Sequence, residues 1–198
     1  MGAIFQSLNR TLIAGVVLLV AILLLASAMT GTSIPLGERA WWTFFVRWLH
    51  VMAGVMWIGL LWYFNFVQMP SMPKIPDEQK PAVSKVIAPA ALFWFRHAAL
   101  WTVITGATLA TLNNYIMQAL TLQRPFTAIG IGMWLALIMA FNVWFIIWPN
   151  QKKALGLVPV EADAKAKAAR LAMLTSRFNT MLSIPMLFCM VAQQNGGL

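Results

Sequence analysis

Hydrophobic residues are gathered along this chain into five long runs, which short polar segments separate. The runs cover roughly residues 12–30, 41–67, 86–112, 126–149 and 171–192. About 20 apolar residues in a helix cross a hydrocarbon layer about 30 Å thick, and each run reaches that length. The pattern therefore predicts an all-α protein: an integral membrane helical bundle with about five transmembrane helices.

Composition agrees with the pattern, since 61% of the 198 residues are hydrophobic and only 10% are charged. A soluble domain of this length carries roughly a quarter charged residues. We therefore expect residues 1–198 to form a single membrane domain in the lipid bilayer. Within the first 28 residues, Arg10, an apolar run and Ala26-Ser27-Ala28 also resemble a signal peptide. We expect residues 12–30 to remain as an extra N-terminal helix.

The net charge of +9 is distributed unevenly. If all five runs cross the membrane, one side has only Arg39 and Arg124. The other side has nine basic residues: Arg10, Lys74, Lys80, Lys85, Lys152, Lys153, Lys165, Lys167 and Arg170. Cytoplasmic loops carry such an excess. We expect a multi-pass protein of the bacterial inner membrane, with a cytoplasmic N-terminus, a periplasmic C-terminus and no nucleic-acid partner.

The chain's two histidines both fall inside predicted spans, His50 in the second and His97 in the third. Ionisable residues at that depth are costly and usually functional, and imidazole is a common ligand of haem iron. One hypothesis is a haem b held by both histidines, with Arg47 or Arg96 near a propionate and Gly54 allowing close approach. The alternatives are a haem held by His50 alone and histidines that only make hydrogen bonds within the bundle.

Polar residues on the last two spans suggest a second candidate site. Ser176, Asn179, Thr180 and Ser183 form one helical stripe, which is either a pocket wall or a set of contacts between helices. Arg177, Asn179, Gln151 and Asn150 could together bind a planar anionic substrate. For the WPNQKK segment, we expect Pro149 to end the fourth helix, and an ordinary basic stop-transfer end is the alternative.

Several kinds of chemistry are disfavoured. No Asp or Glu lies inside a predicted span, which argues against a carboxylate proton relay, a carboxylate-bridged metal centre and a Ser-His-Asp hydrolase. Cys189 is the single cysteine, so an intrachain disulfide and a covalently attached c-type haem, which needs C-x-x-C-H, are excluded.

Four blocks carry a resemblance to a known family: RWLHVMAGVMWIGLLWYFNFVQ, LFWFRHAALWTVITGATL, FNVWFIIWPNQKKALG and SRFNTMLSIPMLFCMVA. Taken in order, they resemble the membrane domain of the bacterial urate hydroxylase PuuD family, also called the urate oxidase N-terminal domain. The resemblance covers residues 41–192. It implies an inner-membrane protein that oxidises urate and passes electrons onward. It also implies motif positions at His50, Asn150, Gln151, Lys152, Arg177, Asn179 and Pro185.

The chain departs from that family in several ways. We expect a short form of the membrane domain without the C-terminal cytochrome c domain, and the last span reads VAQQNGGL where the family often has a histidine. His97 stands where relatives more often have an aromatic residue.

Two functions follow from this comparison. The first is a b-haem oxidoreductase related to urate hydroxylase that passes electrons to a separate cytochrome c. The second is a non-catalytic accessory subunit of a larger respiratory or photosynthetic membrane complex. Transport is disfavoured because intramembrane carboxylates and internal repeats are missing.

Overall fold

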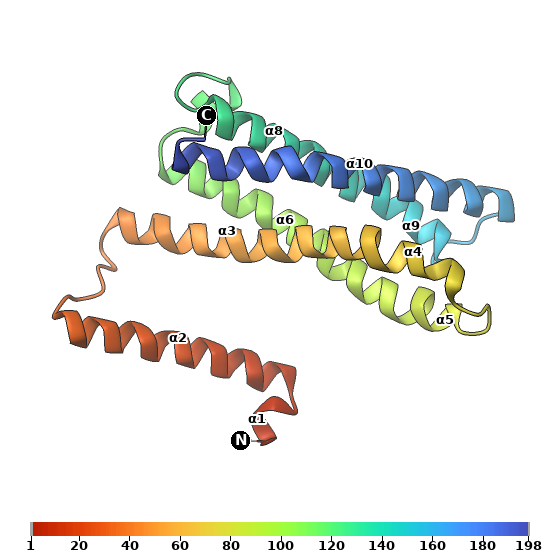
Figure 1. The fold of residues 1–198 in the computed structure, drawn as a ribbon, viewed down its shortest axis with the longest axis horizontal. Helices are drawn as coiled ribbons and strands as arrows, with labels where there is room; N and C mark the ends of the chain where they lie inside the picture. Colours follow the sequence, from red (N-terminus) through yellow and green to blue (C-terminus); the bar gives the residue numbers. More distant parts are fainter. Residues whose placement is uncertain (1, 198) are drawn as a thin grey trace. The chain divides into compact units, whose positions relative to one another are not determined.

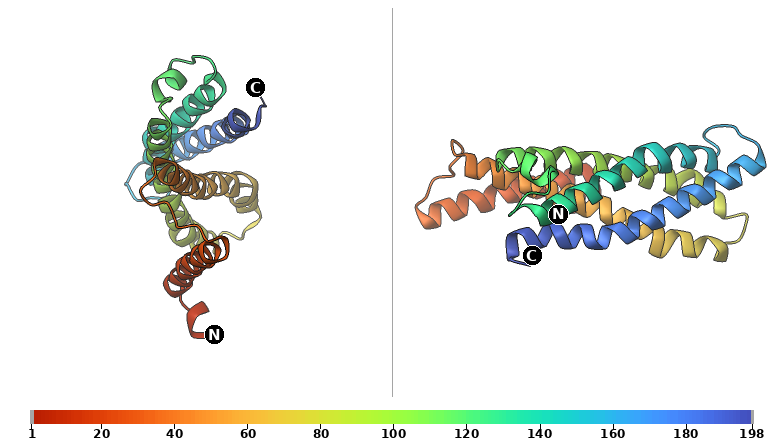
Figure 2. Two further views of the ribbon diagram at one scale, coloured as in Figure 1. Left: turned by 90° about the vertical axis from the view of Figure 1, so that its left-hand side faces the viewer. Right: turned by 90° about the horizontal axis from the view of Figure 1, so that it is seen from above.

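The computed structural model describes residues 2–197, and all regular structure among them is helical (Figures 1 and 2). The predicted all-α class is therefore confirmed. The long helices are α2 (Leu8–Thr30), α3 (Arg39–Trp62), α6 (Ala88–Leu112), α8 (Thr127–Phe141) and α10 (Ala162–Asn195). The short elements are α1 (Gly2–Phe5), η1 (Tyr63–Gln68), α4 (Met69–Ser71), η2 (Met72–Lys74), α5 (Lys80–Ala82), η3 (Val83–Ile87), α7 (Ile116–Leu120), η4 (Asn142–Ile147) and α9 (Trp148–Ala154).

Four continuous helical stretches among the described residues are long and apolar enough to cross a membrane. They are Leu8–Thr30, Arg39–Lys74, Lys80–Leu112 and Thr127–Ala154, and they contain the first four predicted spans. The chain therefore has the features of a multi-pass membrane protein. The fifth predicted span, residues 171–192, is helical as part of α10 but is not among the four. Its first turns carry charges, and its buried residues include Ser176, Asn179 and Ser183, so its crossing of a membrane stays a prediction.

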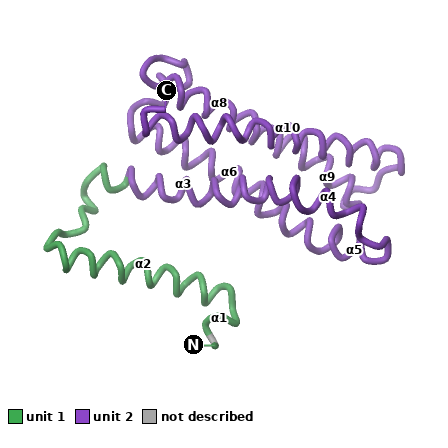
Figure 3. The backbone as a smooth tube through the Cα atoms, viewed as in Figure 1, with its two compact units in different colours: residues 1–42 green, residues 43–198 purple. Residues whose placement is uncertain are grey.

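The chain forms two compact units, residues 1–42 and 43–198 (Figure 3). The first unit contains α1, α2 and the first four residues of α3. Its long helix, α2, is strongly apolar and is capped by Gly31, whose φ of 67° places it in the left-handed region. Glycine adopts this conformation at little cost, so it is a common helix C-cap. The second unit contains every candidate site residue.

Three π-helical segments interrupt the long helices. In each case the second residue after the segment is a proline. Pro70 follows η1, Pro89 follows η3 and Pro149 follows η4. Proline lacks an N–H and clashes with the carbonyl of residue i−4, and a wider π turn moves that carbonyl away. The expectation that Pro149 ends the fourth helix is therefore wrong, because the helix continues through α9 to Ala154.

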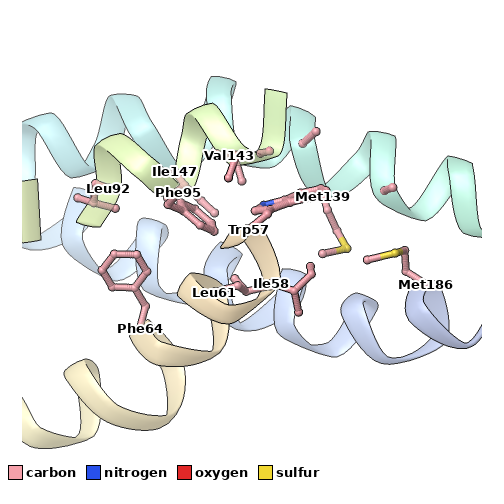
Figure 4. Close-up of a cluster of buried hydrophobic side chains, with 14 residues drawn as sticks. Trp57, Ile58, Leu61, Phe64, Leu92, Phe95, Met139, Val143, Ile147 and Met186 are labelled. Carbon is pink, nitrogen blue, oxygen red and sulfur yellow. The ribbon is translucent and has the colours of Figure 1, made fainter. Parts of the chain in front are cut away.

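The core of the second unit is apolar and is built from α3, α6, α8, η4 and α10 (Figure 4). Trp57 and Leu61 of α3 are fully buried and lie among side chains of the other helices. Trp57 thus packs between helices. Burial of such a side chain contributes about 1.5–3 kcal/mol relative to leaving it in water, and less when the alternative is lipid.

Close approach of backbones holds the last helices together. Helix α10 lies beside α8 over part of its length and beside η4 and α9 over another part (Figures 1 and 2). A Cβ added at Gly132 of α8 would lie 3.1 Å from Cβ of Cys189 on α10, and one at Gly130 would lie 2.1 Å from the carbonyl oxygen of Ala119. Cys189 is buried there as a small apolar residue.

The helices of the second unit run between two ends, named here the Tyr115 end and the Trp148 end (Figure 1). At the Tyr115 end, α6 ends, α8 begins and α10 ends. At the Trp148 end lie α4, α5, α9 and the beginning of α10.

Candidate functional site

His50 lies on α3 and makes its polar contacts with α6. Its Nδ1 is 3.0 Å from the carbonyl oxygen of Thr102 and 3.2 Å from Oγ1 of Thr105. A carbonyl oxygen only accepts, so in the neutral ring the proton must be on Nδ1. The lone pair of Nε2 then remains available to a metal, a proton or another donor.

Gly106 of α6 provides the space in which the His50 ring lies. A Cβ at position 106 would be 2.8 Å from Cε1 and 3.2 Å from Nδ1 of that ring. Real Cβ atoms do not make contacts this short, so any larger residue would displace the imidazole. Thr102, Thr105 and Gly106 therefore fix where His50 lies, although the sequence had not marked them as site residues.

Arg47 lies one turn from His50 on the same face of α3, toward the Tyr115 end. Its Nε is buried and has no hydrogen-bond partner among the described residues. Tyr115 lies close enough for the charge of Arg47 to lower the pKa of its hydroxyl, although burial has the larger effect and raises that pKa overall. The Tyr115 ring stacks on Phe126, with 5.0 Å between centroids and 19° between planes.

His97 faces a different neighbourhood from His50. Its Nδ1 is 2.7 Å from the carbonyl oxygen of Phe93, so it too carries the proton on Nδ1 in the neutral form. Its ring lies 4.2 Å from that of Phe93 and 5.8 Å, edge on, from that of Trp144.

The described contacts of the two histidines have no residue in common. The carbonyl that binds His50 is five residues beyond His97 on α6, about 8 Å along the axis and about 140° around it. The structure therefore does not bring the two imidazoles toward one shared partner.

The remaining two predicted cofactor residues lie apart from this cluster. Arg96 packs its guanidinium over the ring of Trp148, 3.9 Å from the centroid, and its Nη1 donates to the carbonyl oxygen of Leu92. This cation–π contact directs it to the Trp148 end. Gly54 has open space where a Cβ would be, so no described group approaches it closely.

The polar stripe of α10 makes contacts between helices. Asn179 is fully buried, accepts from Nδ2 of Asn142 at 2.8 Å and donates to the carbonyl oxygen of Met139 at 2.9 Å. Asn65 donates to Ser176, and the indole of Trp62 donates to Ser183. These bonds are the interhelical contacts that the sequence offered as one of two interpretations of the stripe.

Of the other predicted substrate residues, Asn150 and Gln151 lie on α9 at the Trp148 end, whereas Arg177 lies near the middle of α10, two residues before Asn179. Arg177 is exposed, Gln151 is half-buried, and the Asn150 amide donates to the carbonyl of Ile146 within its own helix. Their roles, like that of Asn179, stay predictions.

One described groove lies on the opposite face of α3 from His50. It is open and apolar, and its lining consists of Trp48, Val51, Met52, Val55, Met56, Gly59 and Leu60.

The fold and these contacts define a helical protein of the multi-pass membrane class, with a histidine held between two of its apolar helices. Comparison with protein families finds a match in its C-terminal part. Residues 115–196, less than half of the chain, match the family described as "Urate oxidase N-terminal". No curated protein and no solved structure matches the sequence.

The family match confirms the predicted resemblance for the segment from α7 to the end of α10. It includes the WPNQKK and SRFNTMLSIPMLF blocks, and thus Asn150, Gln151, Arg177 and Asn179. The blocks that contain His50 and His97 precede the matched residues, and their kinship stays a prediction.

Proposed function

We propose that this chain is a membrane oxidoreductase that oxidises a planar, purine-like anion, with urate as the first candidate, and passes the electrons to a separate cytochrome c. The observation that carries the proposal is the match of residues 115–196 to the urate oxidase N-terminal family. A second, separate observation is that four described helices are long and apolar enough to cross a membrane.

We further propose that the redox cofactor is haem b with His50 as its protein ligand. Two observations of this structure and one general rule support the fit. The Nδ1 proton is held by the Thr102 carbonyl, which leaves Nε2 free. A backbone carbonyl is a usual partner of a metal-bound imidazole. The ring position is set by Gly106. Bound there, a haem would supply one-electron transfer between substrate and cytochrome.

The chain's own residues have separate tasks in this proposal. The Thr102 carbonyl accepts a hydrogen bond from Nδ1–H, which makes Nε2 a better donor to a metal, and Thr105 limits the rotation of the ring. The surrounding apolar helices exclude water from the ring. His97 shares no described contact with His50, so we assign iron ligation to His50 alone.

The test is the absorption spectrum of the purified full chain, oxidised and dithionite-reduced, with a pyridine haemochrome assay. We expect a Soret band that is lost in His50→Ala and retained in His97→Ala, with both variants folded by circular dichroism. Urate oxidation with added cytochrome c should follow the same order. A wild-type protein that binds no haem when haem is supplied overturns the haem assignment. A haem-loaded protein that does not turn over urate overturns the substrate.

For the location we propose the bacterial inner membrane with the Trp148 end in the cytoplasm. In support, the connectors at that end contain Lys74, Lys80, Lys85, Lys152, Lys153, Lys165 and Lys167. The C-terminus would then be periplasmic, where a soluble cytochrome c could reach the protein.

A second candidate is the accessory subunit of a larger membrane complex. The apolar groove on α3 favours it, because a helix of another subunit would fit such a surface. Native electrophoresis of gently solubilised membranes distinguishes the two. Co-migration with larger subunits supports the second candidate, and an active monomer excludes it.

A further inference from the structure

Arg47 is half-buried, and one of its donor atoms, Nε, is buried without a described acceptor. Its Nε has no hydrogen-bond partner among the described residues, and it lies in a helix apolar enough to cross a membrane. Leaving a buried donor unpaired costs about 1–3 kcal/mol, and more for a charged group. A cation held in this way indicates an anion that is supplied from outside the described residues.

Glu38 of the first unit is nine residues before Arg47, which in a helix is about 13 Å along the axis and about half a turn around it. The acidic side chains of the second unit do not meet this need either. They are Asp77, Glu78, Glu161 and Asp163. All four lie in the connectors or the helix start at the Trp148 end, whereas Arg47 lies toward the Tyr115 end. The salt bridge among the described residues joins Lys80 to Asp77.

Tyr115 adds a second donor near Arg47. Stacking on Phe126 fixes its ring, and burial raises the pKa of its hydroxyl, so the group stays protonated at neutral pH. Arg47 and Tyr115 both come from the Tyr115 end of the second unit, on α3 and just before α7.

We infer that Arg47 and Tyr115 form a binding site for a planar oxyanion, that is, a carboxylate or the ionised edge of a purine-like ring. The unpaired Nε–H belongs to the side-on edge of the guanidinium, where it and one Nη–H can bind two atoms of a planar anion together. The tyrosine hydroxyl can donate to the same anion. The inference rests on the proposed function for the choice of urate as the anion, but not for the existence of the site.

This location differs from the one that the sequence suggested for a substrate. Asn179 belongs to that earlier set. Its side-chain amide oxygen accepts from Asn142 of η4, and its amide nitrogen donates to the Met139 carbonyl of α8. Arg47 is the cation whose buried donor is still unpaired. It is also one helical turn from His50, so a ring bound here would lie next to the proposed cofactor.

The experiment measures binding of urate and of benzoate to the haem-free full chain in detergent, with neutral benzamide as the uncharged control. We expect Arg47→Gln to weaken both anions about tenfold or more, as loss of a charged hydrogen bond predicts. Arg47→Lys, which keeps the charge but loses the side-on edge, should be intermediate. Arg124→Gln removes an exposed cation near the same end and should bind like wild type. Tyr115→Phe gives an independent, smaller loss and serves if Arg47→Gln does not fold.

The anion could also be a haem propionate. A second arm therefore compares retention of haem b with retention of its dimethyl ester, in which the propionate charges are removed. If the propionate is the occupant, Arg47→Gln weakens haem b but not the ester, and urate affinity is unchanged. Unchanged affinities for urate, benzoate and haem b in folded Arg47→Gln overturn the inference. Because the first arm uses haem-free protein, a failure of the haem proposal does not affect it.

Discussion

The ring of His50 occupies the space into which a side chain at position 106 would extend, with Cε1 2.8 Å from the ideal Cβ of Gly106. The two residues belong to different helices, α3 and α6. This contact fixes the distance between the helices at the point where the Thr102 carbonyl accepts a hydrogen bond from the imidazole. It is the steric basis of the proposed site.

The first prediction concerns this contact. Gly106→Ala should lower the free energy of unfolding by about 1–3 kcal/mol, because the added methyl group displaces a packed ring. Unfolding of the detergent-solubilised protein by denaturant, followed by circular dichroism, measures the loss. The matched control is Gly54→Ala on α3, where an added Cβ meets nothing within 4 Å.

A double variant tests the cause of that loss. In a His50→Ala background, Gly106→Ala should cost much less, because the clashing ring is gone. An equal loss with and without the His50 ring would show that the contact described here is not responsible.

The second prediction concerns the pair Asn142 and Asn179. Asn179→Ala leaves the side-chain amide of Asn142 without its described acceptor and removes one of the two hydrogen bonds described for the Met139 carbonyl. We expect a loss of about 1–3 kcal/mol in unfolding free energy, and more than for Thr180→Ala, whose hydroxyl bonds only within α10. Asn142→Leu in the Asn179→Leu background should cost less than in wild type, because the unpaired amide is then absent.

A substrate role for Asn179 would have a different signature. If Asn179 contacts the substrate, Asn179→Ala should weaken urate binding more than Asn142→Ala does at equal stability. Equal effects of the two variants would indicate that the pair acts through helix packing.

The third prediction is a pH dependence at Tyr115. Burial raises the pKa of its hydroxyl above the ordinary value, and Arg47 opposes this only in part. In a Tyr63→Phe variant, Tyr115 is the single tyrosine, and its ionisation can be followed by absorbance near 295 nm. We expect a midpoint above about 10, the usual tyrosine value. Because a buried hydroxyl keeps its proton longer than an unfolded one, folding stability should fall as pH rises from the unfolded to the folded pKa.

Removing Arg47 tests whether its charge lowers the pKa of the Tyr115 hydroxyl. In Tyr63→Phe/Arg47→Gln, the Tyr115 midpoint should rise further, since a cation favours the phenolate. A midpoint that falls on loss of Arg47 would contradict the described proximity of the two side chains.

Much of the fold followed from the sequence because hydrophobic run length alone identifies helices that can cross a membrane. The predicted fifth span was helical, but the four stretches that are apolar enough do not include it. Its buried residues are Ser, Asn, Cys, Met and Ala. Local hydropathy does not show that such residues are paired across helices. The Pro149 error has a similar origin, because a π turn upstream of a proline is decided by geometry and not by the proline alone.

The site was predictable only in part. His50 and His97 were identified by their depth in predicted spans. The direction in which each ring points depends on the rotation of its helix and on distant partners; for His50 that partner is Thr102, 52 residues further along the chain. Thr102, Thr105 and Gly106 form a run of small and polar residues at i, i+3 and i+4 on α6, and that spacing opposite a histidine was the available signal. Tyr115 gave a weaker signal as one of two tyrosines.

The last prediction tests the proposed orientation. In a Cys189→Ser background, Lys167→Cys and Gln123→Cys each place one thiol at an exposed position, the first in α10 at the Trp148 end and the second between α7 and α8 at the other end. Because basic connectors remain on the cytoplasmic side, a membrane-impermeant maleimide should label Gln123→Cys in intact spheroplasts. It should label Lys167→Cys only in inverted vesicles or after detergent is added. The reverse pattern would place the Trp148 end outside. A cytochrome c acceptor in the periplasm would then have to reach the protein from the Trp148 end rather than the Tyr115 end.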